Sequence, residues 1–144
     1  MRKFITVVAL SIASVSVAHA DQLVFSAEKS GGARVAAIDY VSNGDAVAFD
    51  FKIDVPGGTD AVVNLKSCVA ALPKSHAGQC SFAKGQIIGI VYSDSNERLP
   101  KGIISIGSVS VQSKAAGDLS VASFTAVNKD GISVESTVTG SATK

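Results

Sequence analysis

The side chains best suited to chemistry lie close together, between residues 68 and 80. Cys68 and Cys80 are the only cysteines of the chain, and His76 lies between them, next to Ser75. A thiol, imidazole or hydroxyl performs catalysis only when partner groups are held at set positions around it. The chain contains no G-x-S-x-G, H-E-x-x-H or G-x-x-x-x-G-K-[ST] sequence. We therefore predict a protein that is not an enzyme, with no catalytic residue and no cofactor, and we expect His76 to be an exposed loop residue.

A second group of chemically capable side chains lies at residues 94–97. Asp94, Asn96 and Glu97 place several oxygen atoms in one short segment. The segment lacks the central glycine and the later glutamate of an EF-hand calcium loop. We predict a polar turn and no metal site, and the sequence alone leaves a weak calcium site near Asp94 as the alternative.

The beginning of the chain has the three-part pattern of a cleaved secretory signal. Two basic residues precede an uncharged, mostly apolar stretch at residues 4–17, and small residues follow where a signal peptidase reads. We predict a signal peptide over residues 1–20, cleavage after Ala20, and a single domain over residues 21–144 in the periplasm or outside the cell. The apolar stretch is shorter than the roughly 20 residues of a membrane-spanning helix, which argues against an N-terminal membrane anchor. The longest apolar run after residue 20 is residues 87–92, so we expect no membrane insertion once the signal is removed.

The charge balance argues against several classes of partner. Without Arg2 and Lys3, the chain has 11 basic and 12 acidic residues. Nucleic-acid binding needs a basic excess that neutralises phosphates, so we expect no nucleic-acid partner. The chain also has no polybasic run of the kind that holds proteins at membrane surfaces.

The predicted export of the chain indicates which state to expect for its two cysteines. An even number of cysteines in an exported chain favours a disulfide, which we predict between Cys68 and Cys80. Because the closed loop is short, this bridge is expected to add about 3 kcal/mol of stability. A zinc site would need four ligands, and His76 is the only further candidate nearby. The spacing is not C-x-x-C, which argues against a redox-active pair.

Apolar and polar residues alternate through most of the remaining chain, as in β-strands with one buried face. The alternation is clearest at residues 45–55, where Val47, Phe49, Phe51, Ile53 and Val55 are separated by small or charged residues. The stretches that we predict as strands are residues 22–26, 33–41, 45–55, 61–72, 85–93, 102–112, 118–127 and 131–140. A short helical turn within residues 67–72 is the alternative there.

Turn sequences separate these stretches. Residues 42–45 contain an Asn-Gly pair, which is a strong hairpin signal, and glycine- or proline-containing turns follow at residues 56–58, 99–102, 116–118 and 130–131. Alternation with one polar face is typical of antiparallel sheets packed face to face. We therefore predict an all-β, antiparallel β-sandwich of about eight strands, with a closed barrel as the alternative.

The order of motifs from residue 85 onward resembles a known family. GQIIGIVYSDS at residues 85–95 is followed by LPKG, by IISIGSVSV, by AGD, by DG at residues 130–131 and by VTG at residues 138–140. This order resembles cohesin-like domains, bacterial sandwich modules that share a fold with some carbohydrate-binding modules. The resemblance implies a nine-stranded jelly-roll sandwich that binds another protein through a sheet face. It assigns no partner-contacting residue and implies no dockerin partner for this chain.

Three functions are consistent with these patterns. The first is an exported, non-catalytic binding module that recognises a protein or a cell-surface component such as a glycan. The second is a structural subunit of a surface fibre or matrix, assembled by strand addition at sheet edges. The third is a carbohydrate-binding module, or a small inhibitor that uses the loop between Cys68 and Cys80. The chain has no Trp, which weighs against a flat aromatic sugar platform, and we interpret the outward Asp50, Lys52 and Asp54 as a solubilising face.

Overall fold

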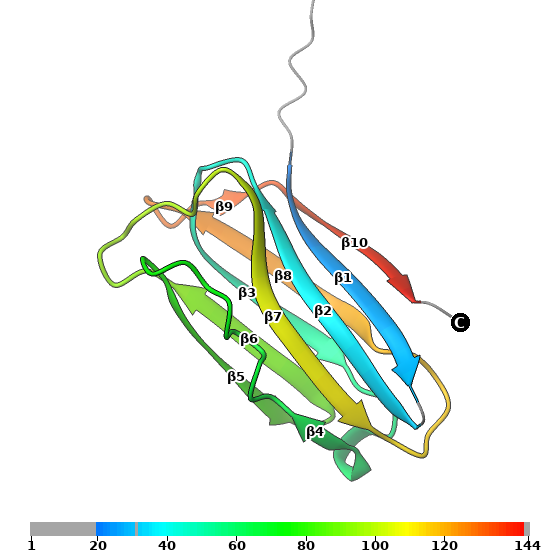
Figure 1. Cartoon of the computed structure of the whole chain (residues 1–144). Helices are drawn as coiled ribbons and strands as arrows, with labels where there is room; N and C mark the ends of the chain where they lie inside the picture. Colours follow the sequence, from blue (N-terminus) through cyan, green and yellow to red (C-terminus); the bar gives the residue numbers. More distant parts are fainter. Residues whose placement is uncertain (1–19, 31, 143–144) are drawn as a thin grey trace, which may run out of the picture.

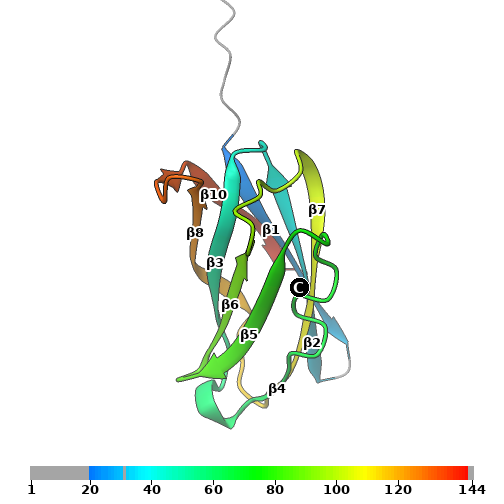
Figure 2. The ribbon, with the colours of Figure 1, turned by 90° about the vertical axis from the view of Figure 1, so that its left-hand side faces the viewer.

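The computed structural model describes residues 20–30 and 32–142, so most of the predicted signal peptide lies outside the described residues. Two five-stranded sheets pack face to face, which confirms the predicted β-sandwich (Figures 1 and 2). Sheet A has the strand order β10-β1-β2-β7-β4, and sheet B has the order β5-β6-β3-β8-β9. No helix within the described residues is long and apolar enough to cross a membrane.

The described residues form ten strands, slightly more than predicted. Sheet A contains β1 (Asp21–Ser30), β2 (Ala33–Ser42), β4 (Val62–Asn64), β7 (Gly102–Gln112) and β10 (Ser136–Ala142). Sheet B contains β3 (Ala46–Asp54), β5 (Ala77–Ala83), β6 (Gln86–Tyr92), β8 (Ser120–Asn128) and β9 (Ser133–Val134). A 3-10 helix, η1 (Gly58–Asp60), precedes β4. The strand pairs are antiparallel except for β1 and β10, which are parallel.

The alternating residues of β3 form the centre of the core, as predicted. Phe49, Phe51 and Ile53, with Val55 just after the strand, belong to the core cluster. Val47 is also buried but lies at a bulge outside this cluster, where Ala46 is the core residue instead. Tyr40 of sheet A stacks on Phe49 with ring centroids 4.6 Å apart, and Phe124 contacts both rings edge-on. Each buried aliphatic or phenylalanine side chain of this kind stabilises the fold by about 1.5–3 kcal/mol when it leaves water.

The prediction of a strand over residues 61–72 was wrong beyond Asn64. After β4 the chain leaves sheet A and continues in turns, in which Cys68 is fully buried and Leu65, Val69 and Leu72 pack against the core. The Ser108 N–H donates to the Ser67 carbonyl, which holds this segment against β7. The apolar residues of the segment therefore reach the core through turns, although their spacing in the sequence is that of a strand.

The turn at residues 42–45 also differs from the prediction. It does not close a hairpin, because β2 belongs to sheet A and β3 to sheet B. The Asn43 N–H donates to the Asp21 carboxylate (2.8 Å), and Gly44 has a positive φ of 93°. The Asn-Gly pair supplies the tight turn, but the two strands separate because Tyr40 of β2 and Phe49 of β3 must face one another across the core.

The carboxylate of Asp21 lies in the buried interior of this turn. It accepts hydrogen bonds from the Tyr40 hydroxyl and from the Asn43 N–H, and both Asp21 and Tyr40 are fully buried. Burial, followed by the hydrogen bond to Asp21 and the charge of Asp21, raises the pKa of Tyr40 well above its usual value of about 10.

This raised pKa predicts a loss of stability at alkaline pH. Above pH about 10, tyrosine ionises in the unfolded chain while Tyr40 stays protonated in the folded one. The free energy of unfolding should then fall with a slope approaching about 1.4 kcal/mol per pH unit. Urea unfolding between pH 8 and 12 should show that Tyr40→Phe removes this component, while the control Tyr92→Phe keeps it. Identical slopes for Tyr40→Phe and the unmodified protein would contradict the assignment.

Candidate functional site

The predicted disulfide between Cys68 and Cys80 is present, with Cα atoms 6.4 Å apart. It connects the buried turn segment after β4 to β5, which is the edge strand of sheet B. Part of the segment between the cysteines is turned inward, since His76 is buried and Leu72 packs against the core, while Ala71 and Lys74 are exposed. An inhibitor of the kind considered above would have Lys74 as its exposed side chain near the middle of this segment.

The expectation that His76 is exposed was wrong. His76 is buried, with Nδ1 2.8 Å from the Ser75 hydroxyl and Nε2 3.0 Å from the Val47 carbonyl oxygen. Because a carbonyl only accepts, Nε2 donates to the Val47 carbonyl, and in the neutral ring Nδ1 accepts from the Ser75 hydroxyl. The hydroxyl of the adjacent Ser75 points at the ring. Both ring nitrogens are thus engaged, and the pair joins the segment before β5 to β3.

The oxygen-rich segment at residues 94–97 forms a turn, as predicted. The Glu97 N–H donates to the Ser93 hydroxyl (3.0 Å), and Asn96 has a left-handed backbone with φ of 55°. No cluster of three or more His, Cys, Asp or Glu side chains with the geometry of a metal site occurs in the part of the chain that the structure describes.

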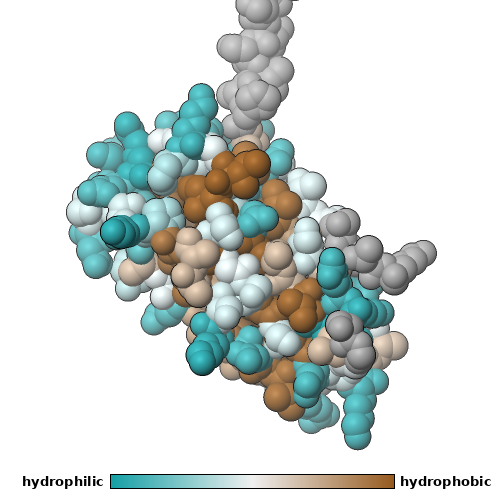
Figure 3. Space-filling view, in the orientation of Figure 1, coloured by the Kyte–Doolittle hydropathy of each residue, from teal (hydrophilic) through white to brown (hydrophobic). Residues whose placement is uncertain are grey.

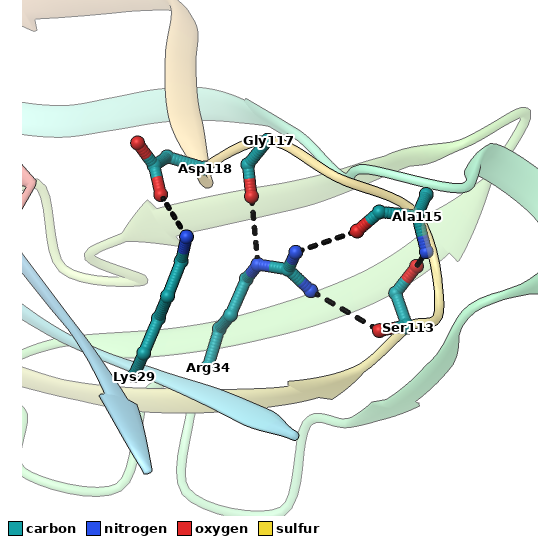
Figure 4. A network of polar contacts seen from close by, with 6 residues as sticks. All are labelled: Lys29, Arg34, Ser113, Ala115, Gly117 and Asp118. Atoms are coloured by element: carbon teal, nitrogen blue, oxygen red, sulfur yellow. Dashed lines mark hydrogen bonds and ion pairs between the residues drawn. The ribbon is translucent and has the colours of Figure 1, made fainter. Parts of the chain in front are cut away.

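Arg34 organises a polar network that the sequence analysis missed (Figure 4). Its guanidinium is largely buried and donates to the carbonyls of Gly117 (2.8 Å), Ala115 (2.7 Å) and Ser113 (3.4 Å). Beside it, Lys29 pairs with Asp118 at 3.2 Å (Figure 4). The sequence contained a sign of this network, because Arg34 lies an even number of positions before Ile38 and Tyr40 and so lies on the buried side of β2.

An open cavity of about 1060 Å³ lies beside this clamped loop. Its lining comes from η1, β4, the start of β2 and the loop after β7, with Asp60 and Lys114 as its charged residues. The other lining residues are small or uncharged, and they include Gly32, Ala33, Gly57, Val62, Gln112, Ser113 and Ala115. The Arg34 contacts therefore fix one wall of the cavity.

The outer face of sheet B combines an apolar row with a charged row. Along β6, Ile88 is half-buried, while Ile90 and Tyr92 keep 42% and 40% of their surface exposed. Along the neighbouring β3, the outward residues are Asp50, Lys52 and Asp54. The register places Ile90 beside Asp50 and Ile88 beside Lys52. We refer to these six residues as the sheet B face.

Smaller side chains border the sheet B face on both sides. On β5, Gln79 and Ser81 lie opposite Ile90 and Ile88. On β8, Thr125 and Ser123 lie opposite Asp50 and Lys52. The Gln86 side-chain amide donates to the Asp54 carboxylate (2.7 Å), which orders one end of the charged row. The apolar centre is thus bordered by groups that can donate or accept hydrogen bonds.

The outer face of sheet A has a different character (Figure 3). Its apolar side chains lie in separate groups among weakly polar residues, and Ile103 is 80% exposed. On β2 the outward residues include Val35, Ala37 and Asp39, and the register places Ser110 and Ser105 of β7 beside Val35 and Asp39. Sheet A therefore offers little charge with which to select a partner.

Comparisons with known proteins identify the fold. No family model and no curated protein matches the sequence. Among solved structures, a non-cellulosomal cohesin from the archaeon Archaeoglobus fulgidus is similar, with a TM-score of 0.60, 14% identity, and coverage of 86% of this chain and 90% of that one.

Two bacterial structures are similar to a comparable degree. A type II cohesin–X-dockerin complex from Acetivibrio cellulolyticus has a TM-score of 0.57, 12% identity, and coverage of 85% of this chain and 95% of that one. The seventh ScaB type I cohesin from Pseudobacteroides cellulosolvens has a TM-score of 0.53, 19% identity, and coverage of 86% and 94%. These likenesses and the two-sheet topology show that the chain has a cohesin-like β-sandwich fold.

Proposed function

We propose that this chain is an exported, non-catalytic protein-binding module that binds its partner with the sheet B face. The observation that carries the proposal is the exposed row of Ile88, Ile90 and Tyr92 directly beside the charged row of Asp50, Lys52 and Asp54. Protein interfaces typically have an apolar or aromatic centre, few central charges and a polar rim. The sheet B face has this arrangement on a rigid sheet.

The two rows have different roles in this proposal. Ile90 and Tyr92 supply affinity, because apolar and tyrosine side chains that become fully covered are frequent binding hot spots. Asp50 and Asp54, with Lys52 between them, supply selectivity, because a partner with mismatched charges would be repelled. The partner that fits is a protein with an apolar surface bordered by basic side chains. The charged row that we interpreted as solubilising thus becomes the border of a binding surface.

Two further observations support the proposal. Two of the similar structures are complexes of a cohesin with a dockerin, so this fold presents protein-binding surfaces in those proteins. The Cys68–Cys80 disulfide fits an oxidising compartment, which agrees with the predicted signal peptide over residues 1–20. A glycan partner has less support, because Tyr92 is the only aromatic residue of the sheet B face.

Paired substitutions on the two sheets test the proposal. Ile90→Asp places a charge in the centre of the sheet B face, and Ile103→Asp places one on sheet A at a still more exposed position. The protein processed at Ala20 should be immobilised and used to capture partners from periplasmic or secreted fractions. Ile90→Asp should weaken binding of the captured protein at least about tenfold, whereas Ile103→Asp should leave it within about twofold.

Both variants should first be shown to unfold at the same urea concentration as the unmodified protein. Equal loss of binding in the two variants, or no loss in Ile90→Asp, would rule out the sheet B face as the binding surface.

A further inference from the structure

We propose that β10 is an exchangeable strand, so that the edge of β1 can bind the C-terminal segment of a second copy of this chain in place of its own. This interaction uses sheet A and is independent of the sheet B face. It would join copies of the protein by strand exchange rather than by contact between preformed surfaces.

The first observation is that β10 contributes little to the core. Its inward positions, defined by pairing with buried residues of β1, include Ser136, Val138 and Gly140. Val138 is 45% exposed, and no residue of β10 belongs to the core cluster among the residues for which burial is described. By contrast, the β1 residues paired with Val138 and Gly140 are Leu23 and Phe25, which are buried.

The second observation is that, among the described residues, β10 is paired with β1 alone, although it also lies near β8. It lies at the edge of sheet A, in parallel register with β1 from Asp21↔Ser136 to Ala27↔Ala142 (Figure 1). Segments with few buried apolar contacts and exposed backbone hydrogen bonds open at a lower free-energy cost than the whole domain. β10 can therefore detach while β1, β2 and β7 stay paired.

Detachment of β10 would expose a binding site on β1, and the structure shows which segment fits that site. The edge of β1 would present unpaired N–H and C=O groups between Gln22 and Ser26. A Cβ at Gly140 would lie 3.3 Å from the Phe25 carbonyl oxygen, so this site favours a strand with glycine at that position. The segment that meets these requirements is the STVTGSA sequence of β10 itself, which every further copy of the chain carries.

The connection before β10 permits exchange between copies. Val134 of β9 packs against the core, and Glu135 alone separates β9 from β10. Glu135 is exposed, and its carbonyl accepts a hydrogen bond from the Asp21 N–H (3.0 Å). A short hinge of this kind favours exchange of the following strand between chains. Rotation at Glu135 would direct β10 away from its own β1.

Engineered cysteines at one register position test the exchange. Val24 pairs with Thr139 in the structure. One chain should carry Val24→Cys and a second chain Thr139→Cys, and the two should be mixed at high concentration under mild oxidation. Exchange brings these two positions side by side in different chains, so a covalent heterodimer is expected. The matched control replaces Thr139→Cys by Thr137→Cys, which lies on the same strand but pairs with Gln22.

Position 137 lies two residues from the partner of Val24, and cysteines at that separation are too distant for a disulfide. The control therefore measures random collision of exposed thiols. The Val24→Cys and Thr139→Cys mixture should give at least about tenfold more heterodimer than the Val24→Cys and Thr137→Cys mixture. A single chain with both Val24→Cys and Thr139→Cys, oxidised while dilute, should lock β10 in place and stay monomeric at any concentration. Equal heterodimer yields in the two mixtures would overturn the proposal.

Discussion

Replacing Gly89 by alanine is expected to lower the free energy of unfolding by about 3 kcal/mol. Gly89 lies in β6 opposite Phe51 of β3, and a Cβ at this position would lie 2.1 Å from Cζ of the Phe51 ring. The Phe51 side chain is fully buried, and its ring packs at a centroid distance of 6.4 Å from that of Phe49, so it has little room to move. Overpacking of a close-packed core costs about 1–3 kcal/mol. Urea unfolding monitored by circular dichroism measures the change.

A double-mutant cycle shows whether the clash with Phe51 is the cause. Phe51→Ala alone should cost about 3–5 kcal/mol because it leaves a cavity. The alanine methyl group at position 89 would occupy part of this cavity, so Gly89→Ala should cost much less in the Phe51→Ala background. Ile88→Val, next in the same strand but on the outer face, should have little effect. If the two core substitutions were additive, the close approach of Gly89 to Phe51 would not be what requires glycine.

The second large effect is expected from removing the disulfide. Cys68→Ala combined with Cys80→Ala should destabilise the protein by about 2–5 kcal/mol. The bridge joins the turn segment after β4, which belongs to neither sheet, to the edge strand β5, whose strand partner among the described residues is β6. Because Gln79 and Ser81 of β5 border the sheet B face, the loss should also increase amide hydrogen exchange at that border.

Reduction of the unmodified protein provides the control for this pair of substitutions. Dithiothreitol should lower the urea midpoint of the unmodified protein by about as much as the double substitution does, and should leave the double variant unchanged. A double variant as stable as the oxidised protein would show that the core alone fixes both segments.

The parts of the fold that could be predicted from sequence are the strands in which apolar and polar residues alternate in step with buried and exposed side chains. Alternation placed Phe49, Phe51 and Ile53 in the core because a central strand has one face buried along its whole length. The Cys68–Cys80 bridge followed from the cysteine count and the expected compartment.

Other elements lack this agreement and could not be predicted. β5, with the sequence AGQCSFA, has mostly small residues because an edge strand buries few side chains, so its period is weak. The stretch at residues 61–72 has the period of a strand, but its apolar residues reach the core through turns. Pairing of β1 with β10 joins the two ends of the domain, and the period of a strand does not specify its neighbour.

The candidate site was only partly visible in the sequence. The outward charges of β3 were identified, but Ile88, Ile90 and Tyr92 lie in a stretch that is apolar on both faces. Their exposure depends on the register between β6 and β3 and on which sheet covers β6, and both are tertiary properties. For Arg34, the alternation of β2 was sufficient to predict that its side chain faces inward. Its three carbonyl acceptors could not be predicted, because they lie in a loop far away in the sequence.

Site-specific photocrosslinking in cells that make the full-length chain would show directly whether the sheet B face binds a partner protein. A benzophenone amino acid should be placed at residue 90, at the centre of the sheet B face, and in a separate strain at residue 103 on sheet A. We expect that irradiation links position 90 to one discrete partner protein outside the cytoplasm and that position 103 gives no such product. The same partner crosslinked equally from both positions, or from position 103 alone, would contradict this expectation.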